Sequence, residues 1–220
     1  MLTGRRTIRD APVVTRALVI AVPMVVLAIP IVVFSPILAL GLLLSGICLL
    51  LFYRDPNRNP PKQGIVSPAD GRVSVIRREG DRWRIGVFMH VFNVHVNRAP
   101  VAGKIGAITH RPGAHRPAFS KDSDHNERVD MHLSAAGGSF EVSLIAGTVA
   151  RRISPYVSDG DTVDQGERIG HIAFGSRADV LLPPTVSRDA LDVSVGDTVT
   201  AGETILVSEH ISCPKAEGSQ

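Results

Sequence analysis

A pattern of ten positions, GDxVxxGExI, occurs twice in the chain and constrains its fold more than any other feature. Residues 157–172, VSDGDTVDQGERIGHI, are matched by residues 193–207, VSVGDTVTAGETILV, at an offset of 36. Glycine permits tight turns, and apolar residues that alternate along a strand face a common core. The two copies therefore predict two related β-hairpins that share one core.

The same pattern resembles the barrel-sandwich halves of biotinyl and lipoyl carrier domains. Carrier domains modify a lysine at a hairpin tip. Lysine occurs in this chain only at positions 62, 104, 121 and 215, and none of these lies in either copy. The repeat thus predicts a barrel-sandwich-like β domain that does not serve as a carrier.

The other apolar runs of this region are short, rich in Val and Ile, and separated by Gly, Asp and Pro, which is typical of strands. They are residues 73–76, 83–88, 91–96, 103–109, 129–133, 140–145 and 148–153. No long helical periodicity runs through them, and only residues 113–127 leave room for a minor helix. We therefore predict a mainly β domain over residues 65–210, followed by a polar tail, 211–220.

The N-terminal part has a different composition. Residues 17–53 contain no Asp, Glu, Lys, Arg or His. As one helix they would extend about 55 Å, against a hydrocarbon core of about 30 Å. Ser35-Pro36 interrupts the run, because proline disfavours helix geometry in the residue before it. The predicted elements are a basic N-terminus, 1–16, a transmembrane helical hairpin, 17–34 and 37–53, and a linker, 54–64.

The charge distribution indicates a membrane partner. Residues 1–16 and 54–62 carry more positive charge than the net +3 of the whole chain, so residues 63–220 are slightly acidic. Basic flanks of apolar segments stay in the cytoplasm and attract anionic lipid. We therefore expect the cell (inner) membrane, with the β domain on its cytoplasmic side, and no nucleic-acid partner. A signal peptide is the alternative, but the apolar run is too long and lacks a small-residue cleavage site.

Three polar residues beside strands are candidates for chemistry: Asp70 in SPADGRV, His95 in HVFNVHVNRAP, and Ser176, which follows Gly175 in FGSRADVLLP. His95 is on the strand parity that faces outward or into a cleft. Each has a structural alternative: an Asp that caps its turn, a packed His, and a Gly-Ser turn. Together they could form a triad in which Asp orients His, His takes a proton from Ser, and Ser attacks a carbonyl. The eight histidines show no metal-binding spacing, so no metal site is predicted.

Four motifs occur in a fixed order behind the apolar hairpin: PADG at 68–71, NVHVNRAP at 93–100, NER at 126–128 and FGSRADVLLP at 174–183. In this combination the chain resembles a phosphatidylserine decarboxylase of the short, membrane-anchored type (type A), over residues 17–207. The longer members of that family read LGST at the processing site, whereas Arg177 follows the serine here. The resemblance implies a self-processing, pyruvoyl-dependent enzyme.

In such an enzyme Ser176 attacks the carbonyl of Gly175, and an ester forms. β-Elimination then splits the chain into a β chain, 1–175, and an α chain, 176–220, with a pyruvoyl group in place of Ser176. The resemblance implies that His95 is the base for maturation and that Asp70 holds its tautomer. In turnover the pyruvoyl ketone forms a Schiff base with the serine amine of phosphatidylserine, carbon dioxide leaves, and His95 returns a proton, which gives phosphatidylethanolamine.

The implied partners are the phosphatidylserine substrate, the lipid bilayer and the two chains of the same precursor, and a homo-oligomer is left open. Around His95 the apolar residues either line the approach of the lipid or pack within the strand, and strand packing is favoured. These residues are Phe88, Met89, Val91 and Phe92.

Two other functions fit parts of the sequence. A membrane-anchored metallopeptidase of the lysostaphin type also has ADG before a strand, but it needs an HxxxD and an HxH pair for zinc, which the sequence lacks. A membrane-tethered barrel-sandwich adaptor needs no reaction chemistry. It predicts a chain that stays uncut.

Overall fold

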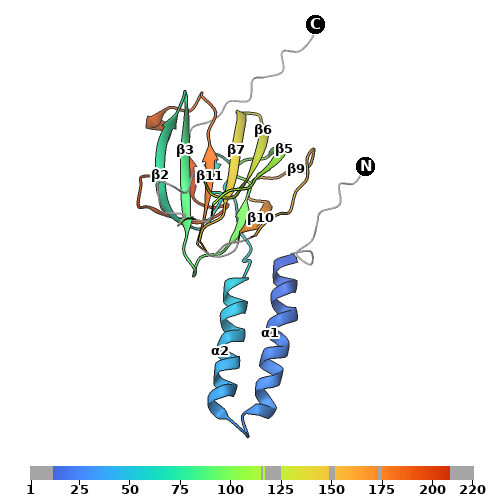
Figure 1. Cartoon of the computed structure of the whole chain (residues 1–220). Coiled ribbons are helices and arrows are strands. Elements are labelled where there is room, and N and C mark those ends of the chain that lie inside the picture. The colour runs from blue at the N-terminus through green and yellow to red at the C-terminus, as the bar shows by residue number, and fades with distance from the viewer. Residues whose placement is uncertain (1–11, 115, 117–124, 149–151, 173–174, 209–220) are drawn as a thin grey trace. The chain divides into compact units, whose positions relative to one another are not determined.

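The computed structural model describes residues 12–114, 116, 125–148, 152–172 and 175–208. The chain divides between Pro56 and Asn57 into two compact units. The first unit contains two helices and the second contains the strands, as the colours of Figure 1 show from blue to red.

The N-terminal unit is a pair of helices, α1 (Pro12–Ile31) and α2 (Pro36–Phe52). Ser35 is the N-cap of α2 and Pro36 its first residue, a position that suits proline because its missing N–H would have no intrahelical partner. The helices approach each other closely, since a Cβ atom on Gly46 would lie 3.0 Å from Val25 Cγ2. The predicted interruption at Ser35-Pro36 is confirmed.

The prediction that these helices cross a membrane is not supported. Among the residues that the structure describes, no helix is long and apolar enough to qualify as a membrane span. The second helix, α2, has 17 residues. Its length is thus about 25 Å, less than a hydrocarbon core of about 30 Å.

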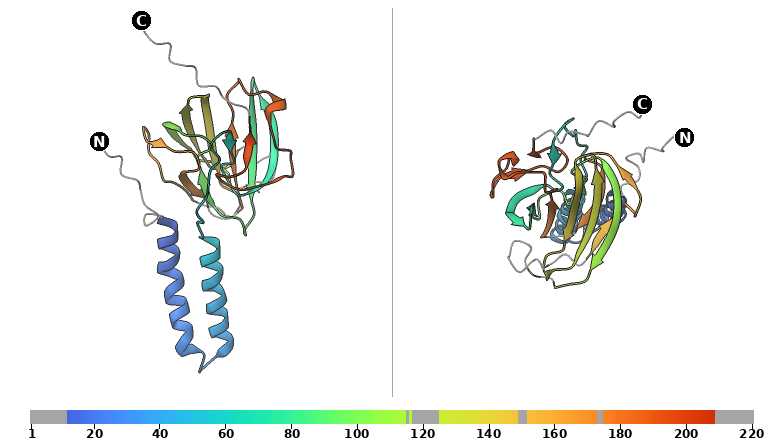
Figure 2. Two further views of the ribbon diagram at one scale, coloured as in Figure 1. Left: turned by 180° about the vertical axis from the view of Figure 1, so that it is seen from behind. Right: turned by 90° about the horizontal axis from the view of Figure 1, so that it is seen from above.

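The second unit is mainly β, as predicted. Its largest sheet has eight antiparallel strands in the order β12-β2-β3-β11-β7-β6-β5-β9. Most of these labels can be followed across Figure 1, and Figure 2 shows that the sheet is curled. Their bounds are β2 (Gly71–Glu79), β3 (Arg82–Met89), β5 (Gly103–Arg111), β6 (Arg128–Ala135), β7 (Gly138–Ile145), β9 (Thr162–Val163), β11 (Ser176–Leu181) and β12 (Thr198–Val199).

Two smaller sheets and a short 3-10 helix complete the β unit. They are β1 (Ile65–Val66) with β13 (Ile205–Val207), β4 (Val96–Arg98) with β10 (Arg168–Ile172) and β8 (Ile153–Pro155), and η3 (Arg188–Ala190). The core consists of the side chains on one face of the central strands. Among them are Ile85, Val87, Met131, Leu133, Phe140, Val142, Leu144, Ala178 and Val180.

One predicted strand, residues 91–96, is wrong. The chain turns sharply between His90 and Asn93, and β4 begins only at Val96. The Asn93 side-chain Oδ1 accepts the N–H of His90 at 2.7 Å, and the Asn93 N–H donates to His90 O at 2.9 Å, so an asparagine closes the turn from both sides. The predicted minor helix, 113–127, and the run 148–153 lie partly outside the described residues.

The two copies of the repeat occupy equivalent places in the β unit. The matching strands β9 and β12 pair with β5 and β2. In the first copy, the Gly160 N–H donates to Ile105 O at 2.9 Å. In the second copy, the Gly196 N–H donates to Val73 O at 2.8 Å. The two copies are therefore equivalent, but the predicted hairpins are wrong. The two strands of each copy, β9 and β10 in the first and β12 and β13 in the second, pair with strands outside the copy and not with each other.

The segments that pair with the two copies are also related to each other, a relationship that was not predicted from the sequence. The segment SPADGRV, which begins at Ser67, corresponds to APVAGKI, 32 residues later. The Val66 N–H donates to Pro100 O at 3.0 Å. At the corresponding position of the other segment, the Arg98 N–H donates to Pro68 O at 2.9 Å. The β unit is thus built from two halves with an approximate two-fold relationship.

Candidate active site

Ser176 is the first residue of β11, in the middle of the curled sheet between β3 and β7. Its register partner on β3 is Met89, and Ser176 Oγ lies 4.0 Å from Met89 Sδ. The side chain is fully buried. A sulfur atom is a weak acceptor, so among the described residues no strong hydrogen bond holds this hydroxyl away from the peptide bond before it.

Gly175 is in the left-handed region, with φ +65°. No atom of the described residues lies within 4 Å of the position that a Cβ atom would occupy there, apart from the chain neighbours. Only glycine adopts such a φ without steric cost, and the space beside the Cα of this one is open. Residue 174, the first of the predicted motif, and residue 173 before it lie outside the described residues.

His95 is buried immediately before β4 and is not exposed to solvent. Its Nδ1 lies 2.9 Å from Asn93 O, and a carbonyl oxygen can only accept a hydrogen bond. In the neutral ring, Nδ1 therefore carries the proton and Nε2 carries the lone pair of a base. The His95 carbonyl accepts the Ile172 N–H at 3.3 Å, which connects His95 to the segment that leads into Ser176.

Asp70 lies in the predicted turn, but its carboxylate is engaged elsewhere. Arg58 Nη2 donates to both carboxylate oxygens, at 2.8 and 3.0 Å, and the Ala201 N–H donates to Asp70 Oδ1 at 2.8 Å. The structure gives no hydrogen bond between Asp70 and His95 among the described residues. The role predicted for Asp70 toward His95 stays a prediction.

Asn97 is a residue of the site that was not predicted from the sequence. This residue is fully buried, and its Nδ2 lies 3.6 Å from Met89 Sδ, the sulfur atom that Ser176 also contacts. Asn97 Nδ2 also lies 3.5 Å from Pro68 O. Because a carbonyl oxygen only accepts hydrogen bonds, this contact assigns the nitrogen end of the amide to that side. Asn97 Oδ1 is buried and accepts no hydrogen bond from the described residues. Its spacing in the sequence could have indicated it. Asn97 and His95 are two residues apart, so on a strand they lie on the same face.

Charged residues lie on the opposite face of the sheet at the same place. Arg177 Nε and Nη2 donate to the two carboxylate oxygens of Asp179 at 2.7 and 3.0 Å, and all these atoms belong to buried side chains. Arg84 Nη1 lies 3.8 Å from Asp179 Oδ2. Burial raises the pKa of the Asp179 carboxyl, and the guanidinium groups of Arg177 and Arg84 oppose this rise. The pair fixes positions 177 and 179 of β11, one and three residues after Ser176.

The NER motif reaches the same end of the sheet. Asn126 Nδ2 donates to Ala146 O at 2.8 Å, just beyond the end of β7. Arg128 begins β6 and is paired with Ile145, which is paired in turn with Arg177 of β11. The four sequence motifs, far apart in the chain, therefore meet around the start of β11.

The place in the β unit that is equivalent to the site by this internal relationship contains a pocket of about 230 Å³. Three residues that line it correspond, at the offset of 32, to residues of the site. They are Gln63 for His95, Ile65 for Asn97 and Ala102 for Asp70. Ile65 and Ala102 thus occupy the positions equivalent to Asn97 and Asp70, so this combination of residues occurs at one of the two related places.

Comparison with known proteins decides the family. A sequence profile described as phosphatidylserine decarboxylase matches residues 46–207. The chain belongs to the phosphatidylserine decarboxylase family. It is 54% identical over 173 residues to a Halobacterium salinarum protein named "Putative archaetidylserine decarboxylase proenzyme", covering 78% of this chain and 86% of that protein. It is 49% identical over 157 residues to the phosphatidylserine decarboxylase proenzyme of Streptomyces coelicolor, with 71% of each chain covered.

A third relative, the phosphatidylserine decarboxylase proenzyme of Thermobifida fusca, is 51% identical over 156 residues, or 70% of each chain. The profile covers all four motifs and both copies of the repeat. The chain is therefore an enzyme, a carboxy-lyase of the phosphatidylserine decarboxylase family with a place in phospholipid synthesis. The metallopeptidase and adaptor alternatives gain no support.

Proposed function

We propose that this enzyme matures by cutting its own Gly175–Ser176 bond and then decarboxylates phosphatidylserine to phosphatidylethanolamine. The observation that carries the proposal is the start of β11, where a left-handed glycine with open space at its Cα precedes a buried serine. The relatives named proenzymes support a maturation step.

Maturation needs only groups of this chain and water. Ser176 Oγ attacks the carbonyl carbon of Gly175 and the amide nitrogen leaves that carbon, so an ester replaces the peptide bond. Removal of the Ser176 α-proton then expels the Gly175 carboxylate and cuts the chain. Water replaces the nitrogen of the dehydroalanine that is left, ammonia departs, and residue 176 becomes a pyruvoyl group.

His95 is the proposed base for these proton transfers. Its Nδ1 donates to Asn93 O, so the lone pair is on Nε2 of a buried ring, and the His95 backbone carbonyl accepts the Ile172 N–H, three residues before Gly175. A neutral imidazole with one nitrogen fixed as donor can take a proton at the other near neutral pH.

The surroundings of Ser176 fit a pyruvoyl group. The position is fully buried, and the amide donor of Asn97 lies beside the same sulfur atom as Ser176 Oγ. The group supplies a ketone that takes up electrons as carbon dioxide leaves. The residues of the chain exclude water from it, and Asn97 provides the adjacent hydrogen-bonding groups. His95 is the proposed proton donor to the carbon that loses carbon dioxide.

The cut halves are expected to stay together. Residues 176–181 of β11 pair with β3 on one side and with β7 on the other. One copy of the repeat lies before the bond and the other after it. The α chain, 176–220, would therefore share its sheet and its core with the β chain, 1–175.

We also propose a location at the cell membrane, with the β unit on the cytoplasmic side. Exposed apolar side chains on both helices support contact with lipid, among them Val19, Ile29 and Ile37. Burial of such side chains in a bilayer is favourable by about 25 cal/mol for each Å² removed from water.

One comparison favours a second substrate. The Halobacterium salinarum relative carries archaetidylserine in its name. The proposed chemistry acts on the serine headgroup and leaves the lipid backbone unchanged, so archaetidylserine is the alternative to phosphatidylserine. Release of carbon dioxide from vesicles of each lipid distinguishes them.

The deciding experiment is the mass of the purified chain under denaturing conditions. We expect two fragments, 1–175 and 176–220, and a carbonyl-reactive, blocked N-terminus on the smaller one. Ser176→Ala should stay whole and inactive. Ser187→Ala is the matched control, because Ser187 makes no side-chain cap bond and should not affect the cut. An uncut wild-type chain that is fully active would refute the proposal.

A further inference from the structure

The turn from His90 to Asn93 exposes an aromatic side chain. Phe92 is 76% exposed, and among the described residues of the β unit the only other exposed large apolar side chain is Val195, at 61%. Turns favour Gly, Pro, Asn, Asp and Ser at their centre, whereas this one has Val91 and Phe92 there. Contact of this exposed ring with an apolar phase would remove it from water, which is favourable.

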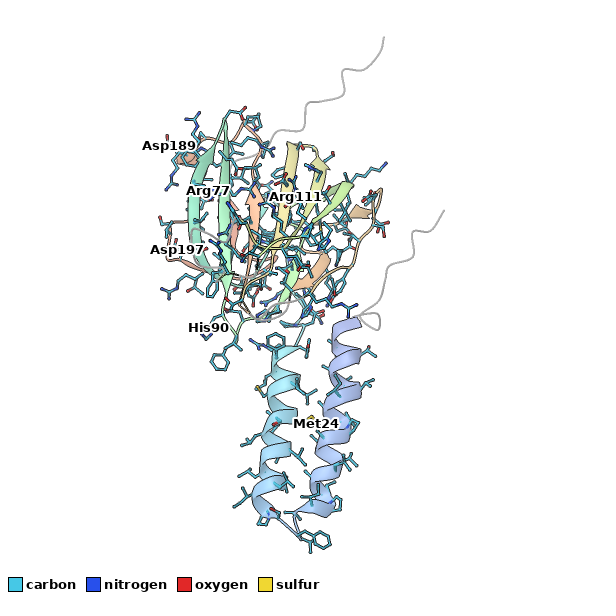
Figure 3. The ribbon with its side chains drawn as sticks, viewed as in Figure 1. Met24, Arg77, His90, Arg111, Asp189 and Asp197 are labelled. Atoms are coloured by element: carbon cyan, nitrogen blue, oxygen red, sulfur yellow. The ribbon has the colours of Figure 1, made fainter. Side chains whose placement is uncertain are left out.

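Hydrogen bonds fix the conformation of this turn. Asn93 closes it through two hydrogen bonds with the backbone of His90, of 2.7 and 2.9 Å. The His90 and Phe92 rings lie 5.5 Å apart. Figure 3 labels His90 at the end of β3, where the sheet stops. The hydrogen-bonded turn therefore holds Phe92 in a defined position.

The same turn is joined to the active site on both sides. The residue before it is Met89, the register partner of Ser176. At its other end Asn93 O accepts the hydrogen bond from His95 Nδ1 at 2.9 Å. Any surface that Phe92 contacts is therefore held next to the site.

We propose that the turn 90–93 is a lipid-contacting surface of the β unit, in which Phe92 enters the boundary between headgroups and acyl chains of a bilayer. This inference rests on the proposed function, because a diacyl substrate keeps its tails in the bilayer while its headgroup must reach Ser176. A second copy of the chain is the less favoured occupant. One turn offers far less area than the roughly 1,000 Å² that a specific protein interface needs.

Depth-dependent fluorescence tests this contact independently of catalysis. Tryptophan is placed at the turn by Phe92→Trp and at a matched exposed site by Val195→Trp, both in a Trp83→Phe background that removes the single native tryptophan. Each full chain is reconstituted in phosphatidylcholine vesicles with and without brominated acyl chains. We expect quenching for Phe92→Trp and none for Val195→Trp. Equal quenching or no quenching at the two sites would overturn the proposal.

A kinetic test uses Phe92→Ala with Val195→Ala as its control. On phosphatidylserine in vesicles, Phe92→Ala should raise the apparent KM about tenfold, the effect of losing one buried aromatic side chain. On short-chain phosphatidylserine dissolved as monomers it should match wild type, and its chain should be cut normally. Equal loss on both forms of substrate would mean that Phe92 acts on the site and not on lipid.

Two further outcomes separate the possible failures. Emission that depends on protein concentration without lipid would identify a second copy as the occupant and overturn the proposal. If every variant and the wild type lack decarboxylation while Phe92→Trp is still quenched, the proposed function fails and the lipid contact stands on its own.

Discussion

His95 Nδ1 lies 2.9 Å from the carbonyl oxygen of Asn93, two residues before it in the chain. The carbonyl oxygen can only accept, so this contact fixes the tautomer with the lone pair on Nε2. A local turn therefore provides an orienting contact for His95. The carboxylate of Asp70 binds Arg58 and the Ala201 N–H, and its predicted role toward His95 stays a prediction.

His95→Ala should leave the chain uncut near neutral pH, because Ser176 then lacks its base. The fraction of cut chain over time, measured by denaturing electrophoresis and mass, gives the result. Partial recovery of cutting by added imidazole would assign the loss to missing base chemistry. Cutting at the wild-type rate would remove His95 from maturation.

Asp70 and Arg58 should act as one unit. Each of Asp70→Asn and Arg58→Gln breaks the ion pair, in which the closest atoms lie 2.8 Å apart, so we expect each to slow the cut. The double variant should be no slower than either single variant, since the same interaction is lost in all three. Impairment in Asp70→Asn alone would mean that Asp70 acts on the site without Arg58.

Asn97→Leu should separate activity from stability. Asn97 Oδ1 is buried without a hydrogen bond from the described residues, so its removal costs the fold little and relieves an unpaired acceptor. Decarboxylation should fall by about tenfold to a hundredfold, the range for one lost hydrogen-bonding group next to a reacting centre. We expect an unchanged or raised melting temperature with reduced kcat. A large fall in melting temperature would assign a structural role.

Gly86→Ala should destabilise the β unit by about 1–3 kcal/mol through overpacking. A Cβ atom there would lie 2.7 Å from Asp179 Oδ1, and Asp179 is buried and held by Arg177. Gly106→Ala is the control in the same sheet, because its Cβ atom would meet only His132 atoms at 3.6 Å. The free energy of unfolding in urea measures both. An equal loss of unfolding free energy in the two variants would mean that Asp179 and Arg177 can shift away from the new Cβ atom without an energetic cost.

Glu203 should make the stability of the β unit depend on pH. The N–H of Asn59 donates to Glu203 Oε1 at 3.1 Å and lowers the pKa of this carboxyl, and Arg58 lowers it further. A lowered pKa stabilises the folded state above the ordinary carboxyl value, about 4.3, and this contribution is lost as the pH falls through the lowered value. Wild type should therefore be more stable than Glu203→Gln at about pH 7, and the two should converge in acid. The measurement is the free energy of unfolding of both proteins as a function of pH. A constant difference between wild type and Glu203→Gln at all pH values would contradict the prediction.

The local pattern of the sequence was enough for several elements. The helix break at Ser35-Pro36 follows from the missing N–H of proline, and the strands follow from short Val- and Ile-rich runs between glycines. The equivalence of the two repeat copies follows from identical residues at a constant offset. The run 91–96 misled because its alternation suits a strand, while the Asn93 side chain satisfies the backbone of a turn at that place.

The sequence by itself determined the mainly β unit, the order of the four motifs and, through them, the family. Only the tertiary structure decided which residues meet. The second internal relationship, the Asp70–Arg58 pair and the shared contact of Ser176 and Asn97 with Met89 all depend on strand pairing between distant segments. Periodicity reports which face of a strand a residue occupies, whereas register and neighbouring strands decide what that face touches.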